Sequence, residues 1–225
     1  MKQTLALLGA LLLASCSSGS NNPGGGSPSP APSLANPIPF ALYPNARVLA
    51  SRDVEQVVTA GQAGGVLSRG AGSYAGKEVI AASGATFAQL QGWVTSLNAR
   101  PPAGYVRATD TSLDRASGPA SSVGLGFALF APAKTSGNPR ALLLIVLDPP
   151  RFTKRLGPVL HYLSSYRSLP SFMRAKIDEQ SQSLTGFTIS EATQADSPIG
   201  AALGALDSLQ RTNARGIILI DATKR

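Results

Sequence analysis

The chain has very little of the chemistry that metal sites and hydrolases use most often. It contains one cysteine, Cys16, and one histidine, His161, among 225 residues. The common zinc sites need several such ligands together, so this composition excludes them, and a lone cysteine also excludes a disulfide framework. No Ser stands three residues before a Lys and no Gly-x-Ser-x-Gly elbow occurs, which removes two familiar serine acyl-enzyme patterns.

Charge is also sparse, because only 14% of the residues are charged, against about a quarter in a typical soluble domain. Basic residues nevertheless outnumber acidic ones by 20 to 12, which gives a formal charge of +8. The densest basic patch contains Arg151, Lys154 and Arg155. The excess indicates either a solvated, mildly basic surface or attraction to anionic lipids or acidic polymers. Nucleic-acid binding needs a concentrated basic face or a recognisable module, and the sequence has neither.

The first residues have the layout of an export signal. Lys2 supplies a charged start, residues 5–13 are apolar, and the small residues Ala14 and Ser15 precede Cys16. The apolar run is roughly half of the ~20 residues that a membrane-spanning helix needs. The pattern therefore predicts a signal peptide over residues 1–15 rather than a transmembrane anchor.

Leu13-Ala14-Ser15-Cys16 resembles the lipobox of bacterial lipoproteins, in which Leu and two small residues precede a lipidated cysteine. The resemblance implies that the chain is cut before Cys16 and that this residue is acylated on sulfur, as by palmitate, and then on its amino group. It also implies a location in the bacterial cell envelope. The anchor would lie in the outer membrane facing the periplasm if the organism has two membranes, and otherwise on the outer face of the plasma membrane.

Composition divides the chain into three segments. Residues 1–15 form the signal, and residues 16–37 are a flexible tether rich in Gly, Ser and Pro, with too few apolar side chains to fold. Residues 38–225 are expected to form a single globular α+β domain, with a subdivision near residue 150 as the alternative. The turn and strand at residues 43–48, followed by the strand and helix of residues 77–98, are similar to small envelope-lipoprotein modules.

Hydrophobic periodicity predicts an antiparallel or mixed sheet covered by three to four helices. A capping box of Thr86 and Gln89 marks one helix start, and Ser197 with Pro198 marks another. Residues 53–72 are expected to be a hairpin or an irregular loop. Strands are expected within residues 43–50, 77–82, 105–109, 123–130, 141–147, 187–190 and 216–221, and helices within 86–99, 156–163, 170–184 and 198–209.

A few polar residues have both a structural and a chemical interpretation. His161 follows Leu160 in a helical stripe, which favours a packing or surface role over that of a catalytic base. Asp110 and Asp114 are expected to form a polar turn, with calcium binding as the alternative. Asp178 and Glu179 point in different directions on a helix and are expected to offset Arg174 and Lys176 on a solvated face.

Two further groups of residues could be structural or functional. Gly61–Gly65 and Gly70–Gly76 are Gly-rich but lack the Lys-Ser/Thr ending of a phosphate loop, so a flexible hairpin explains them better. Aromatic side chains could line a ligand groove, but we expect them to form the core between helix and sheet; they are Tyr43, Trp93, Tyr105, Phe127 and Phe130.

These observations favour a lipid-anchored envelope protein with a non-catalytic α+β domain that binds a partner or supports an assembly. The expected partners are the membrane, through Cys16, and an envelope protein or an acidic polymer, without nucleic acid. No cofactor, metal or catalytic residue is assigned. The alternatives are an envelope hydrolase that cleaves glycan or peptide through scattered carboxylates, and a carrier of a small apolar ligand, which would need a large enclosed pocket.

Overall fold

The structure is a computed structural model that describes residues 33–58, 72–134, 139–160, 166–189 and 197–225. Ser33–Arg225 forms one compact unit. Its centre is a six-stranded antiparallel sheet in the order β1-β2-β6-β5-β4-β3. The strands are β1 (Arg47–Val58), β2 (Gly72–Ser83), β3 (Tyr105–Arg107), β4 (Leu125–Pro132), β5 (Arg140–Leu147) and β6 (Arg215–Lys224).

The described residues also contain five helices, and a short 3₁₀ turn spans Tyr166–Ser168. The helices are α1 (Phe87–Ala99), α2 (Thr111–Ser122), α3 (Pro149–Leu160), α4 (Ser171–Thr185) and α6 (Pro198–Gln210). None of the helices described is long and apolar enough to cross a membrane.

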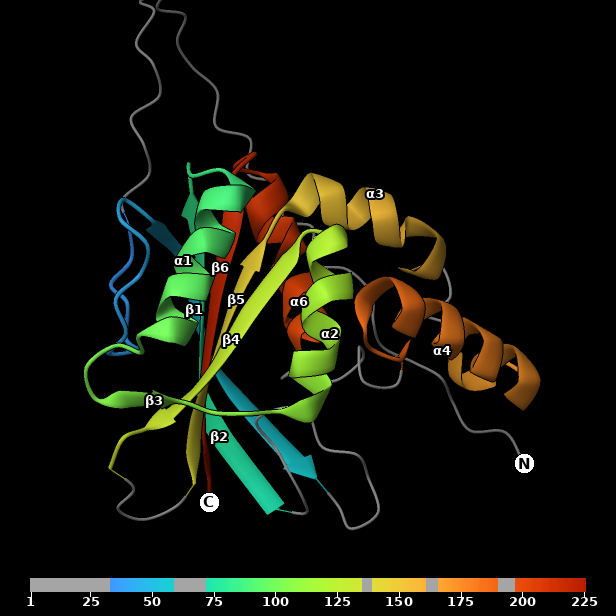
Figure 1. Cartoon of the computed structure of the whole chain (residues 1–225), viewed down its shortest axis with the longest axis horizontal. Helices are drawn as coiled ribbons and strands as arrows, with labels where there is room; N and C mark the ends of the chain where they lie inside the picture. Colours follow the sequence, from blue (N-terminus) through green and yellow to red (C-terminus); the bar gives the residue numbers. More distant parts are fainter. Residues whose placement is uncertain (1–32, 59–71, 135–138, 161–165, 190–196) are drawn as a thin grey trace, which may run out of the picture. The chain divides into compact units, whose positions relative to one another are not determined.

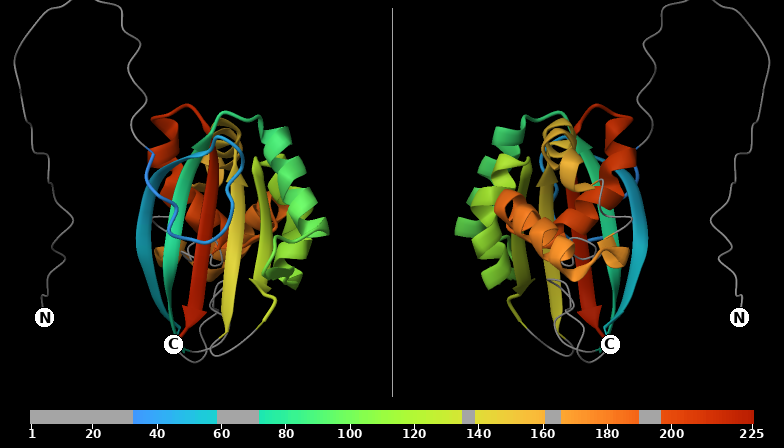
Figure 2. Two further views of the ribbon diagram at one scale, coloured as in Figure 1. Left: turned by 90° about the vertical axis from the view of Figure 1, so that its left-hand side faces the viewer. Right: turned by 90° about the vertical axis from the view of Figure 1, so that its right-hand side faces the viewer.

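The two faces of the sheet are covered differently (Figure 2). One face packs against α1 and residues 33–46, where Phe40, Leu90 and Phe130 are buried. The other face packs against α2, α3 and α6, while α4 packs outside α2 and α3. Alternate residues of β5, such as Leu144 and Ile145, enter opposite cores, as a strand covered on both faces requires.

The helix boundaries agree with the local signals. Thr86 and Gln89 form the predicted capping box at the start of α1, and the Ser197 side chain accepts a hydrogen bond from the Gly200 N–H at the start of α6. Gly186 ends α4 in the left-handed conformation with φ 79°, which glycine adopts without a steric penalty. These three helix ends confirm what the sequence predicts.

The α+β class and an antiparallel sheet are confirmed, with one helix more than the upper expected number. The additional helix is α2, which begins after Asp110 and contains Pro119. Its residues are mostly small or polar and a proline lies within it, a composition that is typical of a turn. The strand expected at residues 187–190 is not formed by residues 187–189, where Phe187 instead packs edge-on against Phe127 with ring centroids 5.9 Å apart.

The sheet has two ends that differ in the elements they carry. At one end, which we call the Asp148 end, β5 finishes at Leu147, next to Gly216 near the start of β6. The opposite, Arg140 end carries the start of β5 and the end of β6, where Arg140 pairs with Thr223 in the register. In Figure 1 the Asp148 end is uppermost and the C-terminus lies at the Arg140 end.

Candidate functional site

A basic hollow of about 780 Å³ lies at the Asp148 end. Four cationic side chains surround it, three from α3 and one from the start of β6. Its lining residues are Ser122, Asp148, Pro150, Arg151, Lys154, Arg155 and Arg215. We refer to these seven residues as the basic hollow.

Asp148 is the acidic residue at the centre of the basic hollow. It follows the buried strand β5, and its side chain is only 8% exposed. Its backbone N–H donates to the Gly124 carbonyl at 2.8 Å, and its own carbonyl accepts from the Phe152 N–H at 2.9 Å. Gly124 has φ +85°, and a Cβ there would lie 3.1 Å from the Asp148 carbonyl oxygen, so this close approach requires glycine. The Asp148 backbone is thus fixed on two sides, which positions its carboxylate.

Two arginines share the Asp148 carboxylate. The Nε atom of Arg215 lies 3.2 Å from Oδ1, and the Nε atom of Arg151 lies 3.7 Å from Oδ2. The Arg151 guanidinium also lies over the Phe87 ring, 5.4 Å from its centroid, which is a cation–π contact. Both guanidinium groups remain partly exposed, so their other N–H groups are available to solvent or a ligand.

Lys154 and Arg155 add positive charge without an acidic partner among the residues that the structure describes. Both side chains are exposed. Their spacing of three and four residues from Arg151 places all three cations on one side of α3. The basic hollow therefore contains four cations and one carboxylate, an imbalance that favours an anionic ligand.

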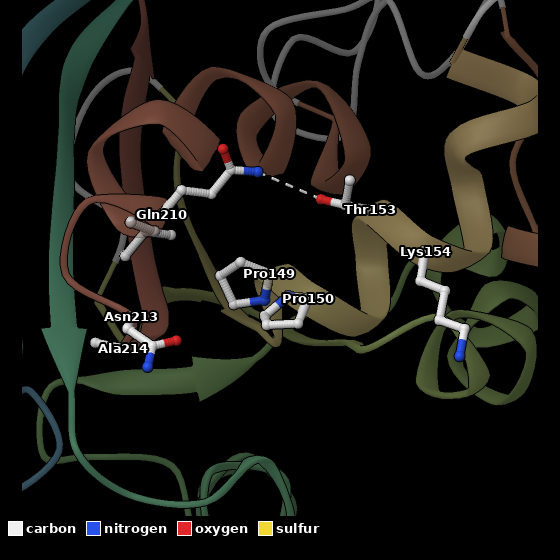
Figure 3. A pocket seen from close by; sticks show the side chains of 8 residues that line it. Pro149, Pro150, Thr153, Lys154, Gln210, Asn213 and Ala214 are labelled. Atoms are coloured by element: carbon white, nitrogen blue, oxygen red, sulfur yellow. Dashed lines mark hydrogen bonds between the residues drawn. The ribbon is translucent and has the colours of Figure 1, made fainter.

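A second hollow of about 410 Å³ adjoins the first one, with which it shares Pro150 and Lys154. Figure 3 shows it between α3 and the end of α6, where the Gln210 side-chain amide donates to the Thr153 hydroxyl at 3.5 Å. Lys154 lies on the far side of Pro150 from Asn213 and Ala214. The other lining residues are uncharged, so the charge is concentrated in the basic hollow.

The two carboxylates that are most buried on β2 and β6 have structural partners. Glu78 is 1% exposed and bonds Arg52 on the neighbouring strand. Asp221 accepts two hydrogen bonds from Arg140. A carboxylate that is held by a cation or a hydrogen-bond donor is more typical of a structural role than of general acid–base chemistry. This weakens the hydrolase alternative.

Asp110 and Asp114 stabilise the start of α2. One Asp110 carboxylate oxygen accepts from the Leu113 N–H at 3.0 Å, and Asp114 pairs with Arg107 at 3.1 Å. The predicted polar turn thus also caps the N-terminus of α2. Within the described ranges, no group of three or more His, Cys, Asp or Glu side chains is arranged to hold a metal ion.

The prediction for Asp178 is wrong. Its carboxylate is half-buried, accepts from the Tyr166 hydroxyl, and accepts from the Ile189 N–H at 2.9 Å. It thus connects α4 to the segments on either side of it instead of balancing Arg174 and Lys176 on a solvated face. Burial of Tyr166 and Ile189 beside α4 supplies the apolar contact that draws these segments together.

The aromatic side chains belong to the core, as expected. Tyr43 and Trp93 make an edge contact with centroids 5.6 Å apart, and Tyr105 and Phe130 make another at 6.5 Å. Phe127 lies on the opposite face of the sheet. The five residues therefore do not form one groove.

The pKa values of Tyr105 and Arg140 are both raised in the fold. Burial, and then the negative charge of Asp221, raise the pKa of Tyr105, while the charge of Arg140 opposes them. The hydrogen bond to Asp221 raises the pKa of Arg140 further above its usual value, against a smaller opposing effect of burial. Tyr105 and the Arg140–Asp221 ion pair form a cluster at the Arg140 end, where two hydrogen bonds stabilise the ion pair.

Cys16, His161 and Gly61–Gly65 lie outside the described residues. Of the sequence-derived candidates, the structure assembles Arg151, Lys154 and Arg155 into a site. Sequence reasoning missed Arg215 and Asp148 as members of it. The available signal was weak: each residue flanks a continuous apolar strand, but the sequence does not reveal that the two strand ends are adjacent.

The comparisons with known proteins add no relative: no family model, no curated protein and no solved structure matches the chain.

Proposed function

We propose that this chain is a lipid-anchored protein of the bacterial cell envelope, held by Cys16, whose α+β domain binds an anionic partner and has no catalytic role. The observation that carries the binding role is the basic hollow, in which Lys154 and Arg155 stand beside two arginines that share one buried carboxylate. The anchor rests on the lipobox resemblance and on the Gly-, Ser- and Pro-rich segment that follows Cys16.

The same observations disfavour the two alternatives. A carboxylate pair for glycosidic cleavage requires two acids that flank a substrate, whereas Glu78, Asp148 and Asp221 are each paired with arginine. A carrier of an apolar ligand requires a predominantly apolar cavity, whereas the basic hollow is lined by four cations and one carboxylate.

The anchor is tested by mass spectrometry of the mature protein purified from detergent-solubilised membrane. We expect the N-terminal residue to be Cys16 with the added mass of two or more acyl chains, because a single chain holds a protein only marginally. A Cys16→Ala variant should lose these masses and leave the detergent phase. An unmodified N-terminus at another residue would overturn the anchor.

The binding role is tested by titration calorimetry with an inorganic polyphosphate of defined length as the probe. Lys154→Glu with Arg155→Glu should weaken binding about tenfold or more, because two charges reverse at the site. The matched control is Lys134→Glu with Lys176→Glu, which changes the net charge equally at exposed positions outside the hollow. Equal weakening by both pairs would mean that net charge alone attracts the probe, and the binding role would be wrong.

A further inference from the structure

We infer that the Asp148 end faces the membrane and that the basic hollow binds the phosphate headgroups of anionic lipids in the same membrane that holds Cys16. This inference rests on the proposed function and names the anionic partner. It combines two independent observations: where the described chain starts, and where four cations gather around a single carboxylate.

The described chain starts beside the Asp148 end. The Ser33 hydroxyl accepts from the Val48 N–H at 3.1 Å, and the Leu34 N–H donates to the Val48 carbonyl at 3.3 Å. Val48 is next to Arg47, whose row across the sheet leads through Ala82 and Gly216 to Leu147. Asp148 comes directly after Leu147. Figure 1 shows the start of the described chain and the start of α3 at the same, upper end.

A short segment of chain separates this end of the sheet from the proposed anchor at Cys16. Residues 16–32 comprise 17 residues, and a flexible chain of that length has a mean end-to-end distance of roughly 20–25 Å. The eight residues of β5 extend about 27 Å away from this end. The proposed anchor therefore joins the sheet at its Asp148 end and not at its Arg140 end.

The chemistry of the basic hollow suits a phosphate headgroup. A phosphate monoanion or diester accepts hydrogen bonds from guanidinium N–H groups and pairs with an ammonium group. Arg151 and Arg215 are oriented by Asp148, while Lys154 and Arg155 project without an acidic partner in the described part of the chain. The volume of about 780 Å³ falls within the range of about 300–1,000 Å³ seen for ligand sites.

Tethering makes weak headgroup affinity sufficient. An anchor in the bilayer turns headgroup binding into an intramolecular event, with an effective concentration set by the tether. Basic residues close to an anionic surface strengthen the membrane binding that acyl chains provide, as polybasic segments do. The domain would then present its Arg140 end away from the membrane.

The test is lysine footprinting on the acylated, full mature protein in vesicles. Phosphatidylcholine vesicles are compared with vesicles containing about 30% phosphatidylglycerol, and acetylation of each lysine is followed by mass spectrometry. We expect Lys154 to react about fivefold more slowly on the anionic vesicles and Lys134, beyond β4 at the Arg140 end, to react at an unchanged rate. High salt should abolish the difference, because it screens exposed charges.

A variant pair sharpens this test with Lys154 as the reporter. Arg155→Glu should reduce the protection to about twofold or less, whereas Lys176→Glu, which removes a positive charge on α4, should leave it at about fivefold. Equal acetylation of Lys154 on both vesicle types would overturn the inference. So would protection by added polyphosphate but not by phosphatidylglycerol, which would identify a soluble polyanion as the partner and leave the proposed function standing. A protein without acyl chains would fail at the preceding mass measurement.

Discussion

Acidic and basic side chains are paired differently at the two ends of the sheet. At the Arg140 end, acids have cations of their own: Arg140 pairs with Asp221, Lys77 with Asp53, and Arg225 with Glu55. At the Asp148 end, two arginines share one carboxylate and two more cations have no acidic partner in the part of the chain described. The modest basic excess of the sequence therefore becomes a local site in the fold.

The difference arises from the secondary structure that carries each set of charges. Lys77 and Asp53 are register partners on adjacent antiparallel strands, a geometry that brings opposite charges together. Arg151, Lys154 and Arg155 lie within one helix at spacings of three and four residues, which brings like charges together. Such a helix face is unfavourable by itself and becomes favourable when an anion neutralises it.

The largest expected change in the free energy of unfolding comes from Gly76→Ala at the Arg140 end. A Cβ at Gly76 would lie 1.9 Å from the Asp221 carbonyl oxygen, so β2 and β6 would have to separate. We expect a loss of about 3 kcal/mol or more in the free energy of unfolding, measured by chemical denaturation.

Gly157→Ala in α3 is the control, because a Cβ there meets no atom within 4 Å. This substitution should stabilise the protein by up to about 1 kcal/mol through helix propensity. Similar results for the two alanines would show that the close approach of β2 and β6 at Gly76 is not essential.

An intermediate effect is expected at the Asp148 end from Asp148→Asn. The substitution leaves Arg215 and Arg151 without their shared counter-charge. The expected loss is about 2 kcal/mol, below the ~3–5 kcal/mol of a fully buried pair because both guanidinium groups touch water. Binding of polyphosphate should meanwhile tighten about threefold or more, since the hollow gains positive charge.

Asp53→Asn at the Arg140 end is the matched control, because Asp53 and Lys77 are both exposed. It should change stability by less than about 0.5 kcal/mol. If Asp148→Asn weakened polyphosphate binding in a protein that remains folded, the carboxylate would be part of anion recognition and not a counter-charge to it.

The smallest expected effect is the alkaline response of the Arg140 end. Because the pKa of Tyr105 is raised from its usual 10.0, the folded state holds the phenol proton more tightly than the unfolded state. The stability that this proton contributes is complete below about pH 10 and is lost as pH rises through the folded pKa. Tyr105→Phe should remove this part of the alkaline destabilisation.

The response is measured as the difference in phenolate absorbance between the wild type and Tyr105→Phe during a pH titration, which isolates one of five tyrosines. Urea midpoints at pH 9 and pH 11 give the corresponding stability change. Asp221→Asn should move the Tyr105 titration to lower pH, because the charge of Asp221 raises that pKa and only burial would then oppose the charge of Arg140. An unchanged titration would mean that Asp221 does not act on Tyr105.

Local signals in the sequence determined most of the elements. The capping box at Thr86, the left-handed glycine after α4 and the apolar runs of β5 and β6 each specify a helix end or a buried strand within a few residues. The helix α2 was missed because Pro119 and the small, polar residues around it are typical of a turn. The role of Asp178 was missed because its partners lie in segments that pack beside α4 only in the fold.

By itself, the sequence determined the α+β class, the burial of β5 and β6, and the cluster of three cations near residue 151, because each depends on residues close together in the chain. Only the tertiary structure decided that β6 lies between β2 and β5, and therefore that Arg215 reaches Asp148 across the sheet end. Strand order depends on contacts between residues far apart in the chain. Many strand orders would gain a similar free energy from hydrophobic burial. The basic hollow exists because packing selected one of them.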